Sequence, residues 1–283
     1  MTLRNVSDTA LWMATYRAME TERVDALFHD PYAERLAGDR GRAIVREMPQ
    51  GASMAWSMSV RTAVIDDMLL ACIAAGAHTV VNLGAGLDMR AFRLKLPASL
   101  HWFDVDLPET IAYRGEALKG VSAVCRHFHL EADLADADGL ARVLRSLEDS
   151  KGPILILTEG LLIYLTPEAV SDMAVRLGLE ARFRWWIMDL VSPRLLASVA
   201  RQWHSRLETA KAPFLFAAEN SRKFFGLTGW REREFRSTFE EAGRLGRPPP
   251  AVPWWDETAM AWWMTPPEER RRLSGVALME PDE

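Results

Sequence analysis

The stretch TVVNLGAGLDMR, residues 79–90, joins a short apolar run to two closely spaced glycines. Its apolar and β-branched residues predict a buried strand over Thr79–Leu83. Gly84 and Gly86 follow directly, and glycines at a strand end let backbone amides approach a ligand without obstruction by side chains. A tight turn from strand to helix also requires glycine for steric reasons, so the pair alone leaves open whether this is a binding loop or a turn.

Downstream of this stretch, predicted strands and helices alternate. Strands are predicted at His101–Val105, Val124–Leu130, Ile154–Leu157 and Arg184–Leu190, and helices at Glu109–Lys119, Leu140–Leu147 and Pro167–Leu179. Uninterrupted apolar strands such as ILIL, residues 154–157, are typical of parallel sheets with helices on both faces. The sequence therefore predicts an α/β fold built on a doubly wound, mostly parallel sheet.

The segments before residue 78 and after residue 191 do not follow this alternation of strands and helices. Helices are predicted behind a cap at Ser7 or Asp8, from Asp30-Pro31 onward and over Ser59–Ala75, and residues 229–283 carry a predicted helix at Trp230–Ala242 and a last strand at Val276–Met279. Residues 192–228 leave the regular order, which predicts a helical lid or an insertion facing the substrate. We expect one domain with an N-terminal helical cap (1–77), a cofactor-binding core (78–191), the lid (192–228) and a C-terminal completion of the sheet (229–283).

Composition excludes several classes of protein. The 283 residues are 26% charged and 49% hydrophobic, as in soluble globular proteins, and a net charge of −5 gives no field that attracts nucleic acid. No apolar run approaches a membrane span or a signal peptide. Cys72 and Cys125 are too few for a disulfide framework and are not spaced as a metal pair, so we expect a cytoplasmic protein without a metal. The 11 tryptophans indicate core packing, an aromatic-walled cavity, or both.

The residues after the glycines discriminate between cofactors. In a dinucleotide fingerprint a third glycine would stand at position 89, which is Met89 here, and Asp88 places a negative charge where a pyrophosphate would lie. A nicotinamide dinucleotide is therefore disfavoured. S-adenosylmethionine carries a cationic sulfonium and suits acidic surroundings better.

Acidic residues follow the second, third and fourth predicted strands. Asp104 and Asp106 stand about 20 residues after the glycines, an offset suited to the hydroxyls of a ribose, although they could also cap the next helix. Asp133 could accept a hydrogen bond from an adenine amino group while Leu134 packs on the ring, or it could cap a helix. Glu159 ends the fourth strand, where a carboxylate suits an ammonium or sulfonium group.

Several motifs in order resemble a known family. They are Thr9-Ala10 with RAME (17–20), DPYA (30–33), VRT (60–62), VNLGAGLDMRAFRL (81–94), FDVDLP (103–108) and TEGLLIYL (158–165). Together they resemble the leucine carboxyl methyltransferase family, in particular its bacterial branch of S-adenosylmethionine-dependent O-methyltransferases, which includes the tetracenomycin-pathway carboxyl methyltransferase. The resemblance covers about residues 5–241 and implies a class I methyltransferase, Rossmann-like fold and methyl transfer to oxygen.

The resemblance also implies roles for individual residues. Arg61 would hold the methionine carboxylate, Gly84 and Gly86 would approach the methionine portion through the backbone, Asp106 in preference to Asp104 would bind the ribose, Asp133 and Leu134 would bind the adenine, and Glu159 would face the methionine end. Met89 stands where the family usually has Thr or Ser, and Asp104 where it often has Glu. Neither departure removes a charge that the cofactor needs.

The acceptor decides whether a base is required. A carboxylate is already ionised at neutral pH, whereas a phenol gains from a general base. Candidate catalytic residues are His204 and Tyr164, and candidate acceptor-binding residues are Tyr16, Arg17, Arg194 and Trp203. The aromatic insertion and the Trp-rich tail favour a small aromatic or polyketide-like acceptor. A protein C-terminal carboxyl methyltransferase and a non-catalytic regulatory or scaffold protein of this fold are the alternatives.

Overall fold

The computed structural model describes residues 7–48, 51–209, 213–249 and 266–282. Its strands are β1 (Thr79–Leu83), β2 (His101–Asp106), β3 (Arg126–Glu131), β4 (Ile154–Thr158), β5 (Phe183–Val191), β6 (Trp230–Ser237) and β7 (Ser274–Pro281). Its helices are α1 (Ser7–Thr21), α2 (Ala33–Glu47), η1 (Ala52–Met54), α3 (Ala55–Ala74), α4 (Arg90–Arg93), α5 (Pro108–Ala117), α6 (Ala137–Ser146), η2 (Leu162–Tyr164), α7 (Pro167–Gly178), α8 (Pro193–Thr209), α9 (Ser221–Gly226), α10 (Thr238–Arg244) and α12 (Pro267–Arg271).

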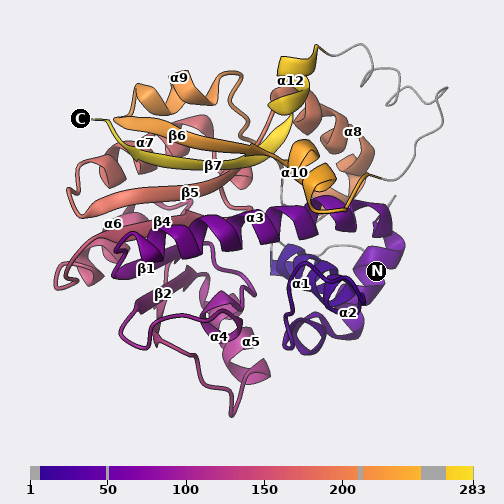
Figure 1. Cartoon of the computed structure of the whole chain (residues 1–283), viewed down its shortest axis with the longest axis horizontal. Coiled ribbons are helices and arrows are strands. Elements are labelled where there is room, and N and C mark those ends of the chain that lie inside the picture. Colours follow the sequence, from indigo (N-terminus) through magenta and orange to yellow (C-terminus); the bar gives the residue numbers. More distant parts are fainter. Residues whose placement is uncertain (1–6, 49–50, 210–212, 250–265, 283) are drawn as a thin grey trace.

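The seven strands form one sheet in the order β3-β2-β1-β4-β5-β7-β6, with helices on both faces (Figure 1). β1 pairs in parallel with both β2 and β4, so the winding of the chain reverses between β1 and β4. β7 lies antiparallel between β5 and β6. The predicted doubly wound, mostly parallel sheet is confirmed, and its switch point between β1 and β4 is where folds of this kind bind their ligands.

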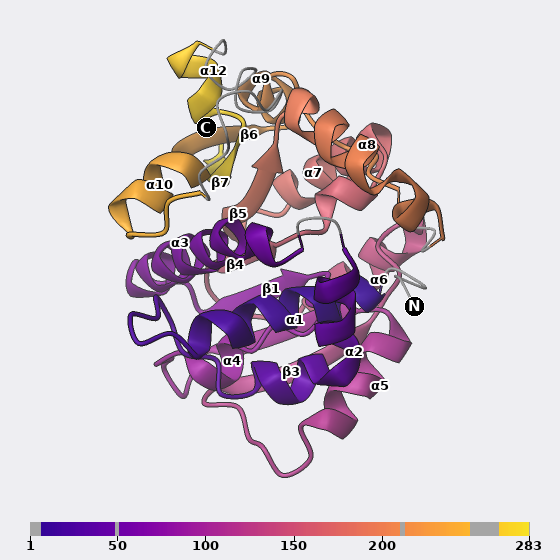
Figure 2. The ribbon, with the colours of Figure 1, turned by 90° about the vertical axis from the view of Figure 1, so that its right-hand side faces the viewer.

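The register aligns the carboxyl ends of three strands. Leu83 of β1 is level with Val105 of β2 and with Thr158 of β4. The residues that follow these three positions therefore leave the sheet at the same height. Figure 2, which looks toward these strand ends, shows α1 and α2 lying over them.

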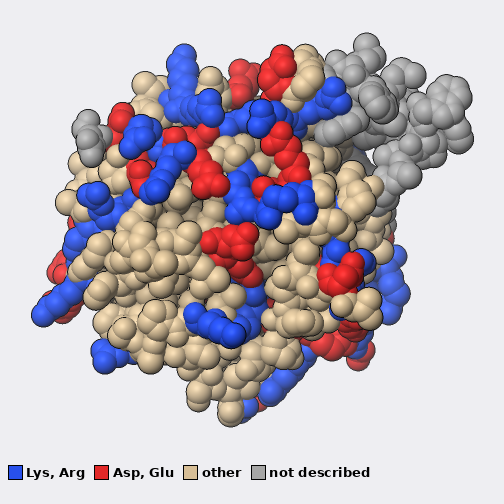
Figure 3. All heavy atoms as spheres, in the orientation of Figure 1, with Lys and Arg blue, Asp and Glu red and all other residues tan. Residues whose placement is uncertain are grey.

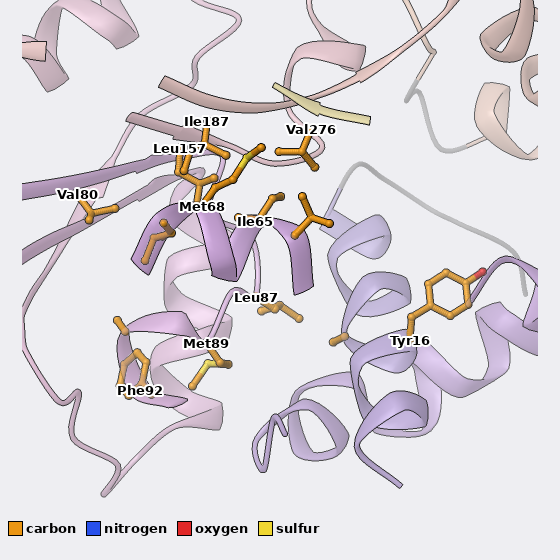
Figure 4. Packing of buried hydrophobic residues seen from close by; sticks show 14 of the residues in the cluster. Tyr16, Ile65, Met68, Val80, Leu87, Met89, Phe92, Leu157, Ile187 and Val276 are labelled. Atoms are coloured by element: carbon orange, nitrogen blue, oxygen red, sulfur yellow. The ribbon is translucent and has the colours of Figure 1, made fainter. Parts of the chain in front are cut away.

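Two buried apolar clusters hold the layers together. In the first, Ile65 and Met68 of α3 pack between sheet residues such as Leu157 and Ile187 and the segment that contains Leu87 (Figure 4). The second lies against α6 and α7 on the opposite face of the sheet. Burial on both faces explains why residues 154–157 of β4 are all apolar, since neither side of this strand meets water. Among the described helices, none is both long enough and apolar enough to cross a lipid bilayer.

One predicted element is wrong. Residues 230–242 do not form a single helix, because Trp230–Ser237 is strand β6 and the helix begins only at Thr238. Arginine and glutamate dominate this strand and favour helix, and the pairing of β6 with β7 is irregular between Glu232 and Glu234, which breaks the alternation typical of a strand. Pairing with β7 overrides the local preference.

The remaining predicted elements differ from the structure mainly at their ends. β3 begins two residues later than predicted, α3 begins at Ala55 rather than Ser59, and the short helix α4 was not expected. The tryptophans at 254, 255, 262 and 263 lie outside the described residues. On the face shown in Figure 3, acidic and basic side chains are interspersed. Between β6 and β7, Arg233 and Glu280 form an exposed ion pair.

Trp230 provides a test of the strand assignment. Its side chain is fully buried, donates from Nε1 to the carbonyl of Ala174 at 2.9 Å, and packs edge-on against Trp186. We expect Trp230→Ala to lower the free energy of unfolding by about 3–5 kcal/mol, because it leaves a cavity and removes the hydrogen bond to Ala174. Leu227→Ala, a nearby truncation at a side chain that is 80% exposed, should cost under about 0.5 kcal/mol. Equal effects of the two changes in urea unfolding would contradict the buried strand.

Candidate functional site

Three residue groups named from the sequence meet at the switch point of the sheet. The aligned positions of β1, β2 and β4 are each followed by one of these residues, namely Gly84, Asp106 and Glu159. Asp133 and Leu134 follow the end of β3, whose Glu131 is level with Asp106. The structure thus brings the residues from four separate motifs to one edge of the sheet.

The glycine loop is fixed by its backbone and by Asp106. Gly84 and Gly86 have φ values of +67° and +51°, a left-handed conformation that side chains disfavour, and a Cβ on Gly84 would lie 2.9 Å from Cδ1 of Leu161. The amide of Gly86 donates to Oδ2 of Asp106 at 2.6 Å, and the amide of Leu107 donates to Oδ1 at 2.7 Å. Burial raises the pKa of Asp106 above its ordinary value, against the lowering effect of these two amides.

Asp104 has a different environment from Asp106, although both point to the same face of β2. It is 1% exposed, and its carboxylate meets Trp102 Nε1 (2.8 Å), Asn82 Nδ2 (3.0 Å), Arg114 Nη2 (2.8 Å) and His127 Nε2 (2.5 Å). Burial alone would raise the pKa of Asp104, but Arg114 and His127 lower it to about 2. Because Arg114 also donates to the carbonyl of Gly86 at 3.3 Å, Asp104 supports the glycine loop from inside the protein. Its predicted contact with a ribose does not match this position.

Asp104 also belongs to the one group of potential metal ligands found among the described residues. One ligand atom each from Asp104, His127 and His129 lies within 4.8 Å of the others. Arg114 already forms an ion pair with the same Asp104 carboxylate, so a cation bound there would lie beside a guanidinium. We assign no metal to this group.

A connected set of ion pairs lies beside the glycine loop, and we call it the arginine–carboxylate cluster. Its members are Arg61 and Asp66 of α3, Asp88, Arg90 and Arg93 of the loop and α4, Glu159 after β4, and Asp189 near the end of β5. Arg61 donates from Nε to Glu159 at 2.9 Å and from Nη1 to Asp189 at 2.9 Å. Its Nη2 lies 3.6 Å from the sulfur of Met13, so Nη2 is the nitrogen that no carboxylate engages.

Glu159 is shared between two guanidinium groups. Its Oε1 accepts from Arg61, and its Oε2 accepts from Nη1 of Arg90 at 2.6 Å. Burial alone would raise the pKa of Glu159, but the charges of Arg90 and Arg61 lower it to about 2. Glu159 is therefore held as a carboxylate in one orientation at the switch point.

Sequence reasoning missed Arg90, Asp66 and Asp189. Arg90 is 2% exposed and donates to Asp66 at 2.6 Å and to Asp88 at 2.7 Å as well as to Glu159. Asp189 lies near the end of β5, as Glu159 lies just after β4, and this shared position was the available signal. Arg90 stands within the quoted motif at residues 81–94, but only the folded structure shows which carboxylates it contacts.

The residues predicted for the adenine lie at the expected edge. Leu134 is 9% exposed and belongs to the apolar cluster that includes Val105 and Ala132. Asp133 is exposed and accepts from the amide of Ala135 at 2.9 Å, which closes a turn. The turn contact and a ligand contact are compatible, since a carboxylate accepts several hydrogen bonds.

The residues predicted for catalysis or for binding an acceptor lie on separate elements, among them α1, η2 and α8. Tyr164 lies in η2 with its ring 5.7 Å from that of Phe214, and burial raises the pKa of its hydroxyl. Arg17 donates to Asp30 at 2.9 Å and to the carbonyl of Leu87 at 2.5 Å, so it ties α1 to the glycine loop. Arg194 is exposed in the first turn of α8. Trp203 and His204 also fall in α8, but their side chains lie outside the described residues.

Two aromatic features of the sequence belong to the core instead. Tyr16 is 1% exposed and donates from its hydroxyl to the carbonyl of Gly51 at 2.5 Å, so its ring packs in the core and its role in orienting an acceptor stays a prediction. Phe216 and Phe225 of the aromatic segment are also buried, and Phe225 packs on Trp186. Within that segment, Phe214 is the ring that contacts Tyr164.

Comparison with known proteins gives one family. The family model described as leucine carboxyl methyltransferase matches residues 10–177. A protein of Frankia alni, whose name assigns it to the S-adenosyl-L-methionine-dependent methyltransferases, is 35% identical over 181 residues, which are 60% of this chain and 63% of that protein. A protein of Parafrankia sp. with the same kind of name is 32% identical over 269 residues, which are 87% and 83%. The chain thus spans less than two thirds of the first relative.

Solved structures share the fold at low sequence identity. A DUF574 family protein from Streptomyces avermitilis has a TM-score of 0.59 at 14% identity and covers 95% of this chain and 96% of its own. A methyltransferase structure from Thermobifida fusca has a TM-score of 0.59 at 16% identity, with 100% and 97% covered. Magnesium protoporphyrin IX methyltransferase from Synechocystis, solved with S-adenosylhomocysteine, has a TM-score of 0.52 at 14% identity, with 89% and 93% covered. These likenesses establish a class I methyltransferase fold.

The lowered pKa of Glu159 predicts a pH-dependent contribution to stability. A carboxyl whose pKa falls from 4.5 to about 2 on folding stabilises the protein above pH 4.5 and loses that effect as the pH falls toward 2. We expect Glu159→Gln to lower the unfolding free energy at pH 7 by about 3 kcal/mol, because Arg61 and Arg90 lose a buried partner. The difference in unfolding free energy between this variant and the unmodified protein, measured by urea unfolding, should decrease as the pH falls from 5 to 3. Glu168→Gln, at an exposed position of α7, should leave the unfolding free energy unchanged. A loss of unfolding free energy in Glu159→Gln that does not depend on pH would contradict the ion pairing assigned to Glu159.

Proposed function

The chain belongs to the leucine carboxyl methyltransferase family, and from this we propose that it transfers the methyl group of S-adenosyl-L-methionine to an oxygen of a small aromatic or polyketide-like molecule. Use of S-adenosyl-L-methionine agrees with the names of its relatives. The oxygen atom and the acceptor class are the parts of the proposal that reach beyond the family.

The observation that carries the proposal is the meeting of the glycine loop, Asp106 and Glu159 at the switch point of the sheet. These residues suit this cofactor. The carboxylates of Asp106 and Glu159 can accept from a ribose and attract the cationic methionine end, and the glycines beside them present backbone without side chains. Asp106 accepts from the amides of Gly86 and Leu107 and from the side chain of Thr110, and its two oxygens together keep capacity for a hydrogen bond that a ribose hydroxyl could donate.

The remaining contacts follow from position and charge. Arg61 would meet the methionine carboxylate through Nη2, since Glu159 and Asp189 engage its Nε and Nη1. Glu159 would attract the ammonium group, and Asp133 and Leu134 would hold the adenine at the end of β3. Asp104 is excluded from this set, because its carboxylate is engaged inside the protein.

The cofactor supplies an electrophilic methyl group, so the chain has to position an oxygen nucleophile in line with it and exclude water. α1 lies over the strand ends, and its Met13 approaches Arg61, which places helix rather than solvent on this side of the site. The phenol of Tyr164 is protonated at neutral pH, and burial raises its pKa further, so it would act on an acceptor as a hydrogen-bond donor rather than as a base. A base for a hydroxyl acceptor would have to come from another residue, and His204 of α8 is our candidate.

The aromatic pair of Tyr164 and Phe214 supports the acceptor class. Their ring centroids lie 5.7 Å apart, and both side chains are partly buried against the first apolar cluster. Planar aromatic molecules gain from such surroundings through burial and edge-to-face contacts. The buried phenylalanines at 216 and 225 do not contribute to this argument.

Cofactor binding tests the site assignment. We expect Arg61→Ala and Asp106→Ala each to weaken S-adenosyl-L-methionine binding by ~1.5–3 kcal/mol, because each removes a charge-assisted contact. Isothermal titration calorimetry gives the affinities, and circular dichroism confirms folding. Glu116→Ala removes an exposed carboxylate paired with Lys119 and should leave the affinity unchanged. Unchanged affinity in both site variants would refute the assignment.

Acceptor preference tests the role of His204. If His204 is the general base, His204→Ala should slow methylation of a phenol at least tenfold, while methylation of an aromatic carboxylic acid and cofactor affinity stay the same, because a carboxylate needs no deprotonation. Product formation with the two acceptors, measured by mass spectrometry across pH, distinguishes the cases. Unaltered phenol methylation would exclude His204 as the base.

A further inference from the structure

Asp189 is, with Asp66, one of two carboxylates of the arginine–carboxylate cluster that no motif identified. Its Oδ1 accepts from the amide of Gly160 at 2.7 Å, and its Oδ2 accepts from Nη1 of Arg61 at 2.9 Å. Its side chain is 21% exposed, so it is held in place and still open on one side. These two contacts, one with the segment that follows β4 and one with α3, place this charge next to Glu159 at the switch point.

The charges of the cluster do not balance. Three arginines, at 61, 90 and 93, face four carboxylates, at 66, 88, 159 and 189, which leaves one net negative charge. The neighbouring Arg17 does not cancel it, because Arg17 is paired with Asp30 at 2.9 Å. Asp106 adds a further carboxylate, which accepts from the amides of Gly86 and Leu107 and from the side chain of Thr110. The cluster therefore favours a ligand with a net positive charge.

Substrate and product of the proposed reaction differ in this charge. In the methyl transfer, the acceptor oxygen forms a bond to the methyl carbon, the carbon–sulfur bond breaks, and its electron pair stays on sulfur. The sulfonium thereby becomes a neutral thioether, and the cofactor loses one positive charge. The amino acid portion carries an ammonium and a carboxylate both before and after transfer.

We infer that Asp189 is a specificity-determining residue that makes the site prefer S-adenosyl-L-methionine over S-adenosylhomocysteine. This rests on the proposed function. A partly buried charge interacts strongly with a nearby cation because solvent screens it poorly. Loss of the sulfonium charge leaves the excess carboxylate uncompensated, which weakens binding of the product and favours its release.

A purely structural role for Asp189 gives a different result. If Asp189 only holds Gly160 and Arg61, its loss affects the two ligands equally, since they share every group except the methyl and its charge. Asp189→Asn retains an oxygen that can accept from the amide of Gly160, so it removes the charge with little change of shape. Asp189→Glu keeps the charge and changes the geometry.

The experiment is calorimetric titration of the unmodified protein and three variants with S-adenosyl-L-methionine and with S-adenosylhomocysteine. For Asp189→Asn we expect about a tenfold loss of affinity for the sulfonium ligand and less than about a threefold loss for the thioether. Asp189→Glu should keep the ratio of the two affinities even if both fall. Asp106→Asn alters a contact common to both ligands and should weaken both equally.

Each outcome has a separate meaning. Equal losses of affinity for the two ligands in Asp189→Asn would overturn the charge-based role. The same conclusion would follow if Asp189→Glu changed the ratio of the two affinities as much as Asp189→Asn does. Failure of the unmodified protein to bind either ligand would overturn the proposed function instead. If Asp189→Asn does not fold, as judged by thermal melting, the ratio for Asp189→Glu still decides, because a ratio far from that of the unmodified protein contradicts the inference.

Discussion

The contact on which the site depends is the sharing of Glu159 between the guanidinium groups of Arg61 and Arg90. It joins α3 and α4 to the end of β4, because Arg61 lies 98 residues and Arg90 lies 69 residues before Glu159 in the sequence. Removing such charges from water is costly, and the cost is recovered only when every partner is in place. The packing that places α3 and α4 over the sheet is therefore a precondition of the site.

Asp104 and Asp106 show how environment separates two like residues. Both lie on one face of β2, yet Arg114 and His127 lower the pKa of Asp104 to about 2, whereas burial raises the pKa of Asp106. Asp104 acts on the glycine loop through Arg114, and Asp106 contacts the loop directly. One amide and one carbonyl of Gly86 are thus held from two sides, which makes the loop rigid before any ligand arrives.

Local patterns predicted most of the sheet because its central strands are buried on both faces and read as apolar runs. β6 was missed because its residues favour helix and only pairing with β7 makes it a strand. The motifs predicted which residues leave the strand ends, since strand ends determine where a chain meets the switch point. They did not predict Asp66 or Asp189, because a partner 27 or 128 residues away leaves no local signature. The burial of Tyr16 likewise depends on the carbonyl of Gly51, 35 residues away.

The arginines of the cluster solve a problem that the fold creates. Parallel strands that end at one level bring Glu159 and Asp189 together. With Asp66 and Asp88 in the same cluster, four carboxylates without cations would repel one another and raise their own pKa values. Three arginines make the arrangement stable but leave it one positive charge short of neutral. A fourth arginine would remove the attraction for a cationic ligand, and a fifth carboxylate would add repulsion within the protein. Three arginines against four carboxylates therefore stabilise the fold and still leave a negative charge that attracts a cationic ligand.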